Sequence, residues 1–188
     1  MASPTQAREG LTLEEFLRLP EEKPYLEFID GRIVAKASAQ NQHGAIQAEL
    51  VTFLNEFARR TKLGRAFVEL RRTFGGRSIV PDIVFQRTEN TPLDRRGRIA
   101  NESYQTPDIH VEILSPRQSL KKSREKLAHS TAHGCPLGWL IDPGRETVKV
   151  SRPSQPVERL AVGDVLLGDP VLPGLRLALA EIFGWLEP

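Results

Sequence analysis

The segment "TPDIHVEILSP", residues 106–116, restricts the fold more than any other part of the sequence. Side chains alternate along a strand, so Ile109, Val111 and Ile113 would lie on one face while Leu114 lies on the other. A strand that is apolar on both faces belongs to a sheet that is covered on both sides. The order helix, hairpin, helix, several strands, helix, strands along the chain predicts such a fold, a mixed α/β domain with a central sheet flanked by helices.

Helices are predicted where apolar residues recur at helical spacing. In "LTLEEFLRLP", Thr12 is the expected N-cap and Glu15 follows three residues later, so a short first helix should end at Pro20. A long helix is predicted over residues 43–61 and another over residues 118–133, and "ALAEIFGWL" has the spacing of a closing helix.

Strands are predicted between these helices. "YLEFIDGRIVAKA" reads as a hairpin around Asp30-Gly31. "GRAFVELRRTF" and "RSIVPDIVF" read as antiparallel neighbours, and Pro81 places a sheet edge or a local irregularity within the second of them. "PLGWLIDPGRETVKVSRP" reads as a strand, a turn and another strand.

The chain of 188 residues has the usual length of one domain. We expect a core over residues 12–150, a C-terminal extension of short strands and a helix over 157–188, and a polar surface excursion over 86–105. The arginines of that excursion, Arg95, Arg96 and Arg98, are expected to be solvated.

Composition excludes several classes of protein. No apolar run reaches the ~20 residues that a membrane span needs, and the first ten residues lack the apolar part of a secretion signal, so we expect a cytoplasmic protein. Cys135 is the single cysteine, which rules out an internal disulfide and a four-cysteine zinc site. The net charge of +2 is weak evidence for any partner.

Two acids stand alone on apolar strands. Asp82 precedes "IVF", and Glu112 shares a strand face with Asp108, His110 and Leu114. If the strands are neighbours, the Asp82 and Glu112 carboxylates would be within reach of one Mg²⁺ or Mn²⁺ ion, hard cations that prefer oxygen. The alternative is that both acids pair with arginines. Asp108 is roughly 13 Å from Glu112 along an extended strand, so we interpret it as a structural acid.

The helix after Glu112 carries a polar stripe of Lys122, Lys126, His129 and His133 at helical spacing. Such a stripe is usually a solvated face, although an ammonium at Lys126 could stabilise a charged transition state. His129 and His133 have the spacing of a zinc pair, but no third ligand is evident. A thiol nucleophile at Cys135 lacks an orienting group, so a buried cysteine is expected.

Six motifs come in the order and with the spacing of the Uma2 family, which is a branch of the PD-(D/E)XK restriction-endonuclease-like fold. They are "EFIDGRIV", "QHGAIQAEL", "VPDIVF", "PDIHVEILSP", "EKLAHSTAHG" and "GWLIDP". The resemblance runs from about residue 12 to residue 183. It implies a central mixed sheet flanked by helices.

The resemblance implies a metal site built by Asp82, Glu112 and the main-chain carbonyl of Ile113. In the parent fold a lysine stands two residues after the second acid, where this chain has Leu114. The family is similar in supplying its lysine from the next helix, which falls on Lys126.

Further positions match the family. Glu27 corresponds to an additional catalytic acid and His43 to a histidine at the start of the long helix, where it would contact substrate. Lys122 stands where relatives often have aspartate and is a second candidate for substrate binding, while Ser130 stands where they often have tyrosine. Tyr25 is shifted by one from its usual place.

The function that the resemblance implies is a Mg²⁺- or Mn²⁺-dependent endonuclease that hydrolyses phosphodiester bonds of nucleic acid, with DNA as the expected substrate. Enzymes that cut both strands often present two sites by symmetry, so a homodimer is expected. Two alternatives remain open. One is a catalytically silent member that binds nucleic acid or protein, and the other is a hydrolase of a different phosphate ester.

Overall fold

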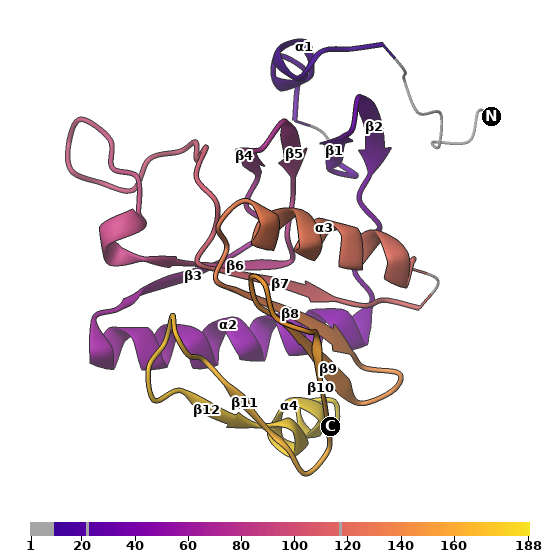
Figure 1. Cartoon of the computed structure of the whole chain (residues 1–188), viewed down its shortest axis with the longest axis vertical. Helices are drawn as coiled ribbons and strands as arrows, with labels where there is room; N and C mark the ends of the chain where they lie inside the picture. The colour runs from indigo at the N-terminus through magenta and orange to yellow at the C-terminus, as the bar shows by residue number, and fades with distance from the viewer. Residues whose placement is uncertain (1–9, 22, 117) are drawn as a thin grey trace.

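The computed structural model of the chain describes residues 10–21, 23–116 and 118–188 (Figure 1). Residues 1–9, on which the expectation about secretion partly rests, lie outside the described residues. The helices are α1 (Leu13–Leu17), α2 (Asn41–Thr61), α3 (Leu120–Ala132), α4 (Leu179–Gly184) and the 3-10 turn η1 (Thr88–Asn90). No helix in the described part of the chain is long and apolar enough to cross a membrane.

The large sheet has six strands in the order β10-β9-β8-β7-β6-β3, and only the pair β7·β8 is parallel. Helix α3 makes the crossover between those two parallel strands, as a parallel connection requires. The strands are β3 (Gly64–Val68), β6 (Ile83–Arg87), β7 (Ile109–Ile113), β8 (Leu137–Asp142), β9 (Thr147–Ser151) and β10 (Glu158–Ala161).

A second sheet has the order β2-β1-β5-β4, and all of its pairs are antiparallel. Helix α1 packs beside this small sheet, where Phe16 meets Phe28 with ring centroids 5.6 Å apart. A third sheet joins two short strands near the C-terminus. The remaining strands are β1 (Leu26–Ile29), β2 (Arg32–Ala35), β4 (Arg72–Phe74), β5 (Arg77–Ile79), β11 (Val165–Leu167) and β12 (Arg176–Ala178).

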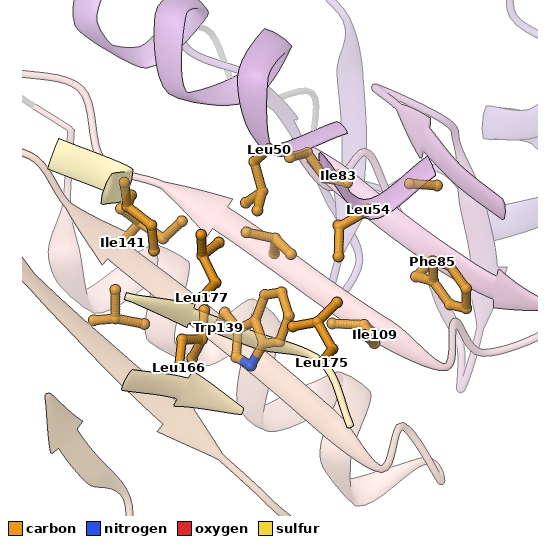
Figure 2. Close-up of a cluster of buried hydrophobic side chains, with 14 of the residues drawn as sticks. Leu50, Leu54, Ile83, Phe85, Ile109, Trp139, Ile141, Leu166, Leu175 and Leu177 are labelled. Atoms are coloured by element: carbon orange, nitrogen blue, oxygen red, sulfur yellow. The ribbon is translucent and has the colours of Figure 1, made fainter. Parts of the chain in front are cut away.

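The main hydrophobic core lies on one face of the large sheet, and Figure 2 shows part of it. Leu50 and Leu54 of α2 approach the sheet from one end of this core, while the C-terminal strands β11 and β12 cover Trp139 of β8. Trp139 and Ile109 are fully buried. Because α2 and the C-terminal elements cover this face together, the strand residues buried in this core are apolar.

The opposite face is covered by α3 (Figure 1). Leu127 of this helix packs with Leu114 and Leu140 in a smaller buried cluster. The predicted mixed α/β fold with a sheet covered on both faces is therefore confirmed.

The predicted antiparallel pair over residues 64–85 is present as one long ribbon, but it is bent. Its inner half, β3·β6, belongs to the large sheet, and its outer half, β4·β5, belongs to the small sheet. Val68 pairs with Ile83 and Arg72 pairs with Ile79, so the register is unchanged across the bend. The irregularity expected at Pro81 is confirmed, whereas the interruption of the first strand between Val68 and Arg72 was not expected. Pro81, which donates no backbone hydrogen bond, lies in the bend.

Local predictions at the N-terminal side agree with the structure except at one boundary. Thr12 and Glu15 form the capping box, and Asp30 and Gly31 both have positive φ, as a tight hairpin turn requires. Helix α1 ends at Leu17 rather than at Pro20. The backbone N–H of Leu19 donates to the Phe16 carbonyl, which closes a tighter final turn before the proline.

Candidate active site

The candidate site lies at the seam between the two sheets, where the ribbon bends. Five buried or nearly buried acidic and lysine side chains of the described residues meet there, and each comes from a different part of the fold. They are Glu27 of β1, Lys36 directly after β2, Asp82 directly before β6, Glu112 of β7 and Lys126 of α3.

Asp82 and Glu112 lie side by side. Ile83 pairs with Val111, so the register places Asp82 level with Glu112, as expected for neighbouring strands. Asp82 is fully buried and Glu112 is 1% exposed. The Asp82 carboxylate accepts a hydrogen bond from the backbone N–H of Ile113 at Oδ2, over 2.7 Å. Neither acid is within ion-pairing distance of an arginine among the described residues, so the arginine-pairing interpretation is wrong.

Lys126 reaches both acids on its side of the site. Its Nζ lies 2.7 Å from Oε1 of Glu112 and 2.9 Å from Oε1 of Glu27, and it donates to the Val80 carbonyl at 3.3 Å. The side chain is buried, so a solvated face is the wrong interpretation for Lys126. Burial alone would lower the pKa of this ammonium. The negative charges of Glu112, Glu27 and Asp82 outweigh burial and raise its pKa above the ordinary value.

Glu112 stays ionised at this site. Burial would raise the pKa of its carboxyl, but the charge of Lys126 and a hydrogen bond from His110 bring the pKa down to about 2. His110 Nε2 lies 2.8 Å from Oε1 of Glu112 and His110 Nδ1 lies 2.7 Å from the Ser130 hydroxyl. An ionised carboxylate can only accept, so Nε2 donates, and in a neutral ring Nδ1 accepts from Ser130.

Sequence reasoning missed Lys36. Its Nζ lies 2.8 Å from Oδ1 of Asp82, without hydrogen-bond geometry, and donates to the Val80 carbonyl at 2.9 Å. A signal was present in the hairpin, because Glu27 pairs with Val34 and Lys36 is two residues further along the same strand face. The hairpin register alone would have placed this lysine beside Glu27.

Glu27 and His43 are held at the site by further contacts. Oε1 of Glu27 accepts from the backbone N–H of Val80 at 2.7 Å. His43, at the start of α2, has Nε2 at 3.6 Å from Oδ1 of Asp82 and Nδ1 at 3.2 Å from the Ser115 hydroxyl. Lys122, the other expected substrate contact, is exposed on α3 and forms no ion pair with the site acids.

Other sequence candidates lie elsewhere. Asp108 accepts hydrogen bonds from Gln86, Asn90 and the backbone N–H of Arg87 at the far end of β7, which is the structural role expected for it. Cys135 is buried, and burial raises the pKa of its thiol to about 12, which disfavours a nucleophilic thiolate.

His129 and His133 are engaged with backbone carbonyls and with Phe74. His129 Nε2 lies 3.1 Å from the Phe74 carbonyl oxygen, and its ring stacks on Phe74 with centroids 5.0 Å apart. His133 Nδ1 donates to the His129 carbonyl at 2.8 Å.

The donor set fits a hard divalent cation. Oδ1 of Asp82 and Oε2 of Glu112 are buried carboxylate oxygens that make no hydrogen bond to any described residue. Within the described ranges, no three His, Cys, Asp or Glu side chains are grouped as a metal-binding set. Mg²⁺ is commonly held by one or two carboxylates together with waters and substrate oxygens, so a pair of acids suffices for it.

Comparisons with known proteins identify the fold and the family of the chain. The crystal structure of a "putative nuclease belonging to DUF820" from Anabaena variabilis superposes with a TM-score of 0.90 at 40% sequence identity, covering 94% of this chain and 99% of that one. The fold is therefore a nuclease fold. The family model of Uma2, described as "Putative restriction endonuclease", matches residues 13–180. The chain belongs to the Uma2 family.

Two further comparisons do not bear on the family or the function. A cryo-electron microscopy structure of a DrdV–DNA complex has a TM-score of 0.42 at 16% identity, covering 63% of this chain and 10% of that chain. The search of curated proteins gave no match.

Proposed function

We propose that the protein is a divalent-metal-dependent endonuclease that hydrolyses phosphodiester bonds of nucleic acid, with DNA as its substrate. The observation that carries the proposal is the buried pair of Asp82 and Glu112, each with one oxygen that makes no hydrogen bond to a described residue. Membership of the Uma2 family and the nuclease fold support it.

Asp82, Glu112 and the main-chain carbonyl of Ile113 would hold Mg²⁺ or Mn²⁺. When bound, such a cation would polarise the scissile phosphate and lower the pKa of the attacking water. Charge balance supports this assignment. Glu27, Asp82 and Glu112 bring three negative charges to the seam, whereas Lys36 and Lys126 bring two positive charges.

Lys126 and Lys36 have different roles in this proposal. Lys126 is protonated, so it acts by donating hydrogen bonds and by its charge rather than as a general base. It fixes Glu112 and Glu27 relative to each other. Lys36 places a second ammonium beside Asp82. A preformed positive charge stabilises the negative charge that develops on phosphate in the transition state. His110 donates a hydrogen bond to Glu112 and is itself hydrogen-bonded to Ser130, and these contacts hold the Glu112 carboxylate in position.

Cleavage of plasmid and of single-stranded DNA, with and without Mg²⁺ or Mn²⁺, tests the proposal. We expect Asp82→Ala and Glu112→Gln to abolish cleavage. Glu125→Gln, on the exposed side of α3, should leave it unchanged and serves as the matched control. Cleavage that persists in both site variants, or that needs no divalent ion, would overturn the assignment.

We also propose that the active form is a homodimer, since two sites related by symmetry suit the cutting of two strands. Analytical ultracentrifugation checks this independently of activity. A protein that sediments as a monomer at all concentrations used for cleavage would refute it.

One observation favours a second candidate function, a catalytically silent member that binds nucleic acid or protein. Lys36 and Lys126 lie 2.8 Å and 2.7 Å from Asp82 and Glu112, so each of these two carboxylates already has a cationic partner from the chain itself. Calorimetry with Mg²⁺ and Mn²⁺ separates the two functions. Absence of metal binding would favour the silent member.

A further inference from the structure

A cavity of about 320 Å³ opens beside the candidate active site, on the side of α1 and the small sheet. We call it the side pocket and define it by Phe16, Tyr25, Glu69, Arg71, Asn101 and Tyr104. A volume of this order is at the lower end of the range of small-ligand sites. Nothing in the proposed hydrolysis uses it.

Glu69 connects the side pocket to the catalytic acids. Its carboxylate lies 3.9 Å from Nζ of Lys36, the same ammonium that lies 2.8 Å from Asp82. Its backbone N–H donates to the Asp82 carbonyl at 3.1 Å. Glu69 also has a φ of 48°, in the left-handed region that residues other than glycine rarely adopt. The contact with Asp82 therefore holds the wall of the pocket directly against the site.

The charge of the side pocket disfavours a phosphate. Its lining contains the carboxylates of Glu21, Glu69 and Glu102 but only one cation, Arg71. Arg71 is already engaged by Glu21 at 2.6 Å and by the Leu26 carbonyl at 3.0 Å. The part of a ligand that enters here should carry no negative charge, and amino groups on it could donate to the carboxylates.

The rim of the side pocket offers a stacking surface. Tyr104 is 61% exposed, and its hydroxyl donates to Glu102 at 2.8 Å. The segment that carries Tyr104 is attached to β4, because Ser103 accepts hydrogen bonds from the side chain of Arg72 and from the backbone of Thr73. An exposed aromatic ring on a fixed segment is the feature on which unpaired nucleobases stack.

Asn101 supplies a group that can read a base. It lies at the pocket and is exposed, and its side-chain amide makes no hydrogen bond to any described residue. Such an amide has both a donor and an acceptor, the combination that pairs with the edge of a nucleobase.

We propose that the side pocket binds one unpaired nucleobase of the substrate, next to the phosphodiester that is cleaved, with the base stacked on Tyr104 and its edge against Asn101. This inference rests on the proposed nuclease function. Because a paired base must be unstacked and unpaired before it can enter, substrates with a mismatch, an overhang or a single strand at that position should bind better than fully paired duplex.

The test uses a single-stranded DNA oligonucleotide that carries the fluorescent base 2-aminopurine, with binding followed by fluorescence. We expect Tyr104→Ala to weaken binding about 5- to 150-fold, the range that stacking of one base contributes. Leu93→Ala is the matched control, because Leu93 is 62% exposed in the same excursion and does not line the pocket. It should bind within about twofold of the unmodified protein.

A change in the substrate provides a second measurement that does not depend on the folding of a variant. One base at a time is replaced by an abasic sugar along the oligonucleotide. We expect one position at which the loss matches that of Tyr104→Ala, and at which the two changes together weaken binding no further. Equal binding by the Tyr104→Ala and Leu93→Ala variants, or insensitivity to every abasic position, would overturn the proposal.

The outcomes separate this proposal from the nuclease function. Metal-dependent cleavage that requires Asp82 but is indifferent to Tyr104 refutes the base pocket alone. Binding that depends on Tyr104 and on one base, without any cleavage, supports the pocket and refutes the nuclease. A protein that binds no oligonucleotide refutes both.

Discussion

Replacement of Lys126 by methionine tests the electrostatic arrangement of the site directly. The substitution keeps the length of the side chain but removes the ammonium that lies 2.7 Å from Glu112 and 2.9 Å from Glu27. Two carboxylates that are at most 5% exposed then lose their shared positive partner. Breaking a buried ion pair by removing one partner typically costs about 3–5 kcal/mol of unfolding free energy.

For a chain of this length that loss corresponds to a fall in Tm of roughly 6–20 °C, at about 2–4 °C for each kcal/mol. Urea denaturation gives the free energy and calorimetry gives the Tm. Lys122→Met is the control, since Lys122 lies one turn earlier on the exposed face of α3 and should change stability by no more than about 0.5 kcal/mol.

The pH dependence of this variant provides a sharper test. In the unmodified protein the pKa of Glu112 lies below its ordinary value, at about 2, so its contribution to stability is present above pH 4.5 and is lost as the pH falls towards 2. Loss of Lys126 removes the largest contribution that opposes burial, so we expect burial to outweigh His110 and Lys36 and to raise the pKa of Glu112 above its ordinary value. The contribution is then present below pH 4.5 and is lost as the pH rises through the raised pKa.

Between about pH 4.5 and 7, the Lys126→Met variant should therefore become less stable with rising pH, while the unmodified protein shows no such loss from Glu112. Adding Glu112→Gln to the variant should restore part of the lost stability and flatten this slope. A loss below about 1 kcal/mol in Lys126→Met, or stability that rises with pH over this interval, would refute the reasoning.

Three further predictions concern the core, the first helix and the cysteine. Trp139→Ala should lower the unfolding free energy by about 3–5 kcal/mol in urea denaturation, because a fully buried indole leaves a cavity; a loss below 1 kcal/mol would contradict its place in the core. Thr12→Ala should cost about 0.5–2 kcal/mol by loss of the capping box, and Thr12→Ser, which keeps the hydroxyl, should not. Burial raises the pKa of the Cys135 thiol from 9.0 to about 12, so stability should fall as the pH rises through that interval, with a smaller slope in Cys135→Ala; equal slopes would argue against it.

The outline of the fold could be predicted because local patterns decide it. The apolar residues on both faces of residues 109–114 required a covered sheet, and the α2 and α3 coverage confirms it. The pairing of Asp82 with Glu112 could be predicted from two lone acids on adjacent apolar strands. In each case the signal was the pattern of apolar and polar residues within single strands, and the order of the strands brought them together.

The bend of the ribbon could not be predicted in the same way. Both strands leave the large sheet together without a change of register, so neither sequence shows an insertion or a shift of alternation. Pro81 marked an irregularity, but a proline cannot indicate that its partner strand bends as well. The bend lies where the ribbon passes from the large sheet to the small one, and the strands that complete these sheets come from distant parts of the sequence.

Which lysines are buried at the site could not be predicted from the sequence either. Lys126 and Lys122 are four residues apart on one helix, and the sequence does not say which of the two is covered. The structure decides it, because Lys126 faces the seam and Lys122 faces outward. Lys36 was missed because a lysine at the end of a short strand usually reaches solvent. Its burial depends on the neighbouring sheet, which the hairpin alone does not reveal.

The bent ribbon also has a mechanical consequence. Glu27 and Lys36 are carried by the small sheet, while Asp82 and Glu112 are carried by the ribbon bend and the large sheet. The ribbon runs through both sheets, so the relative placement of the two sheets sets the spacing between these two pairs of side chains. Any load that tilts the outer half of the ribbon changes the spacing between the two pairs of charges.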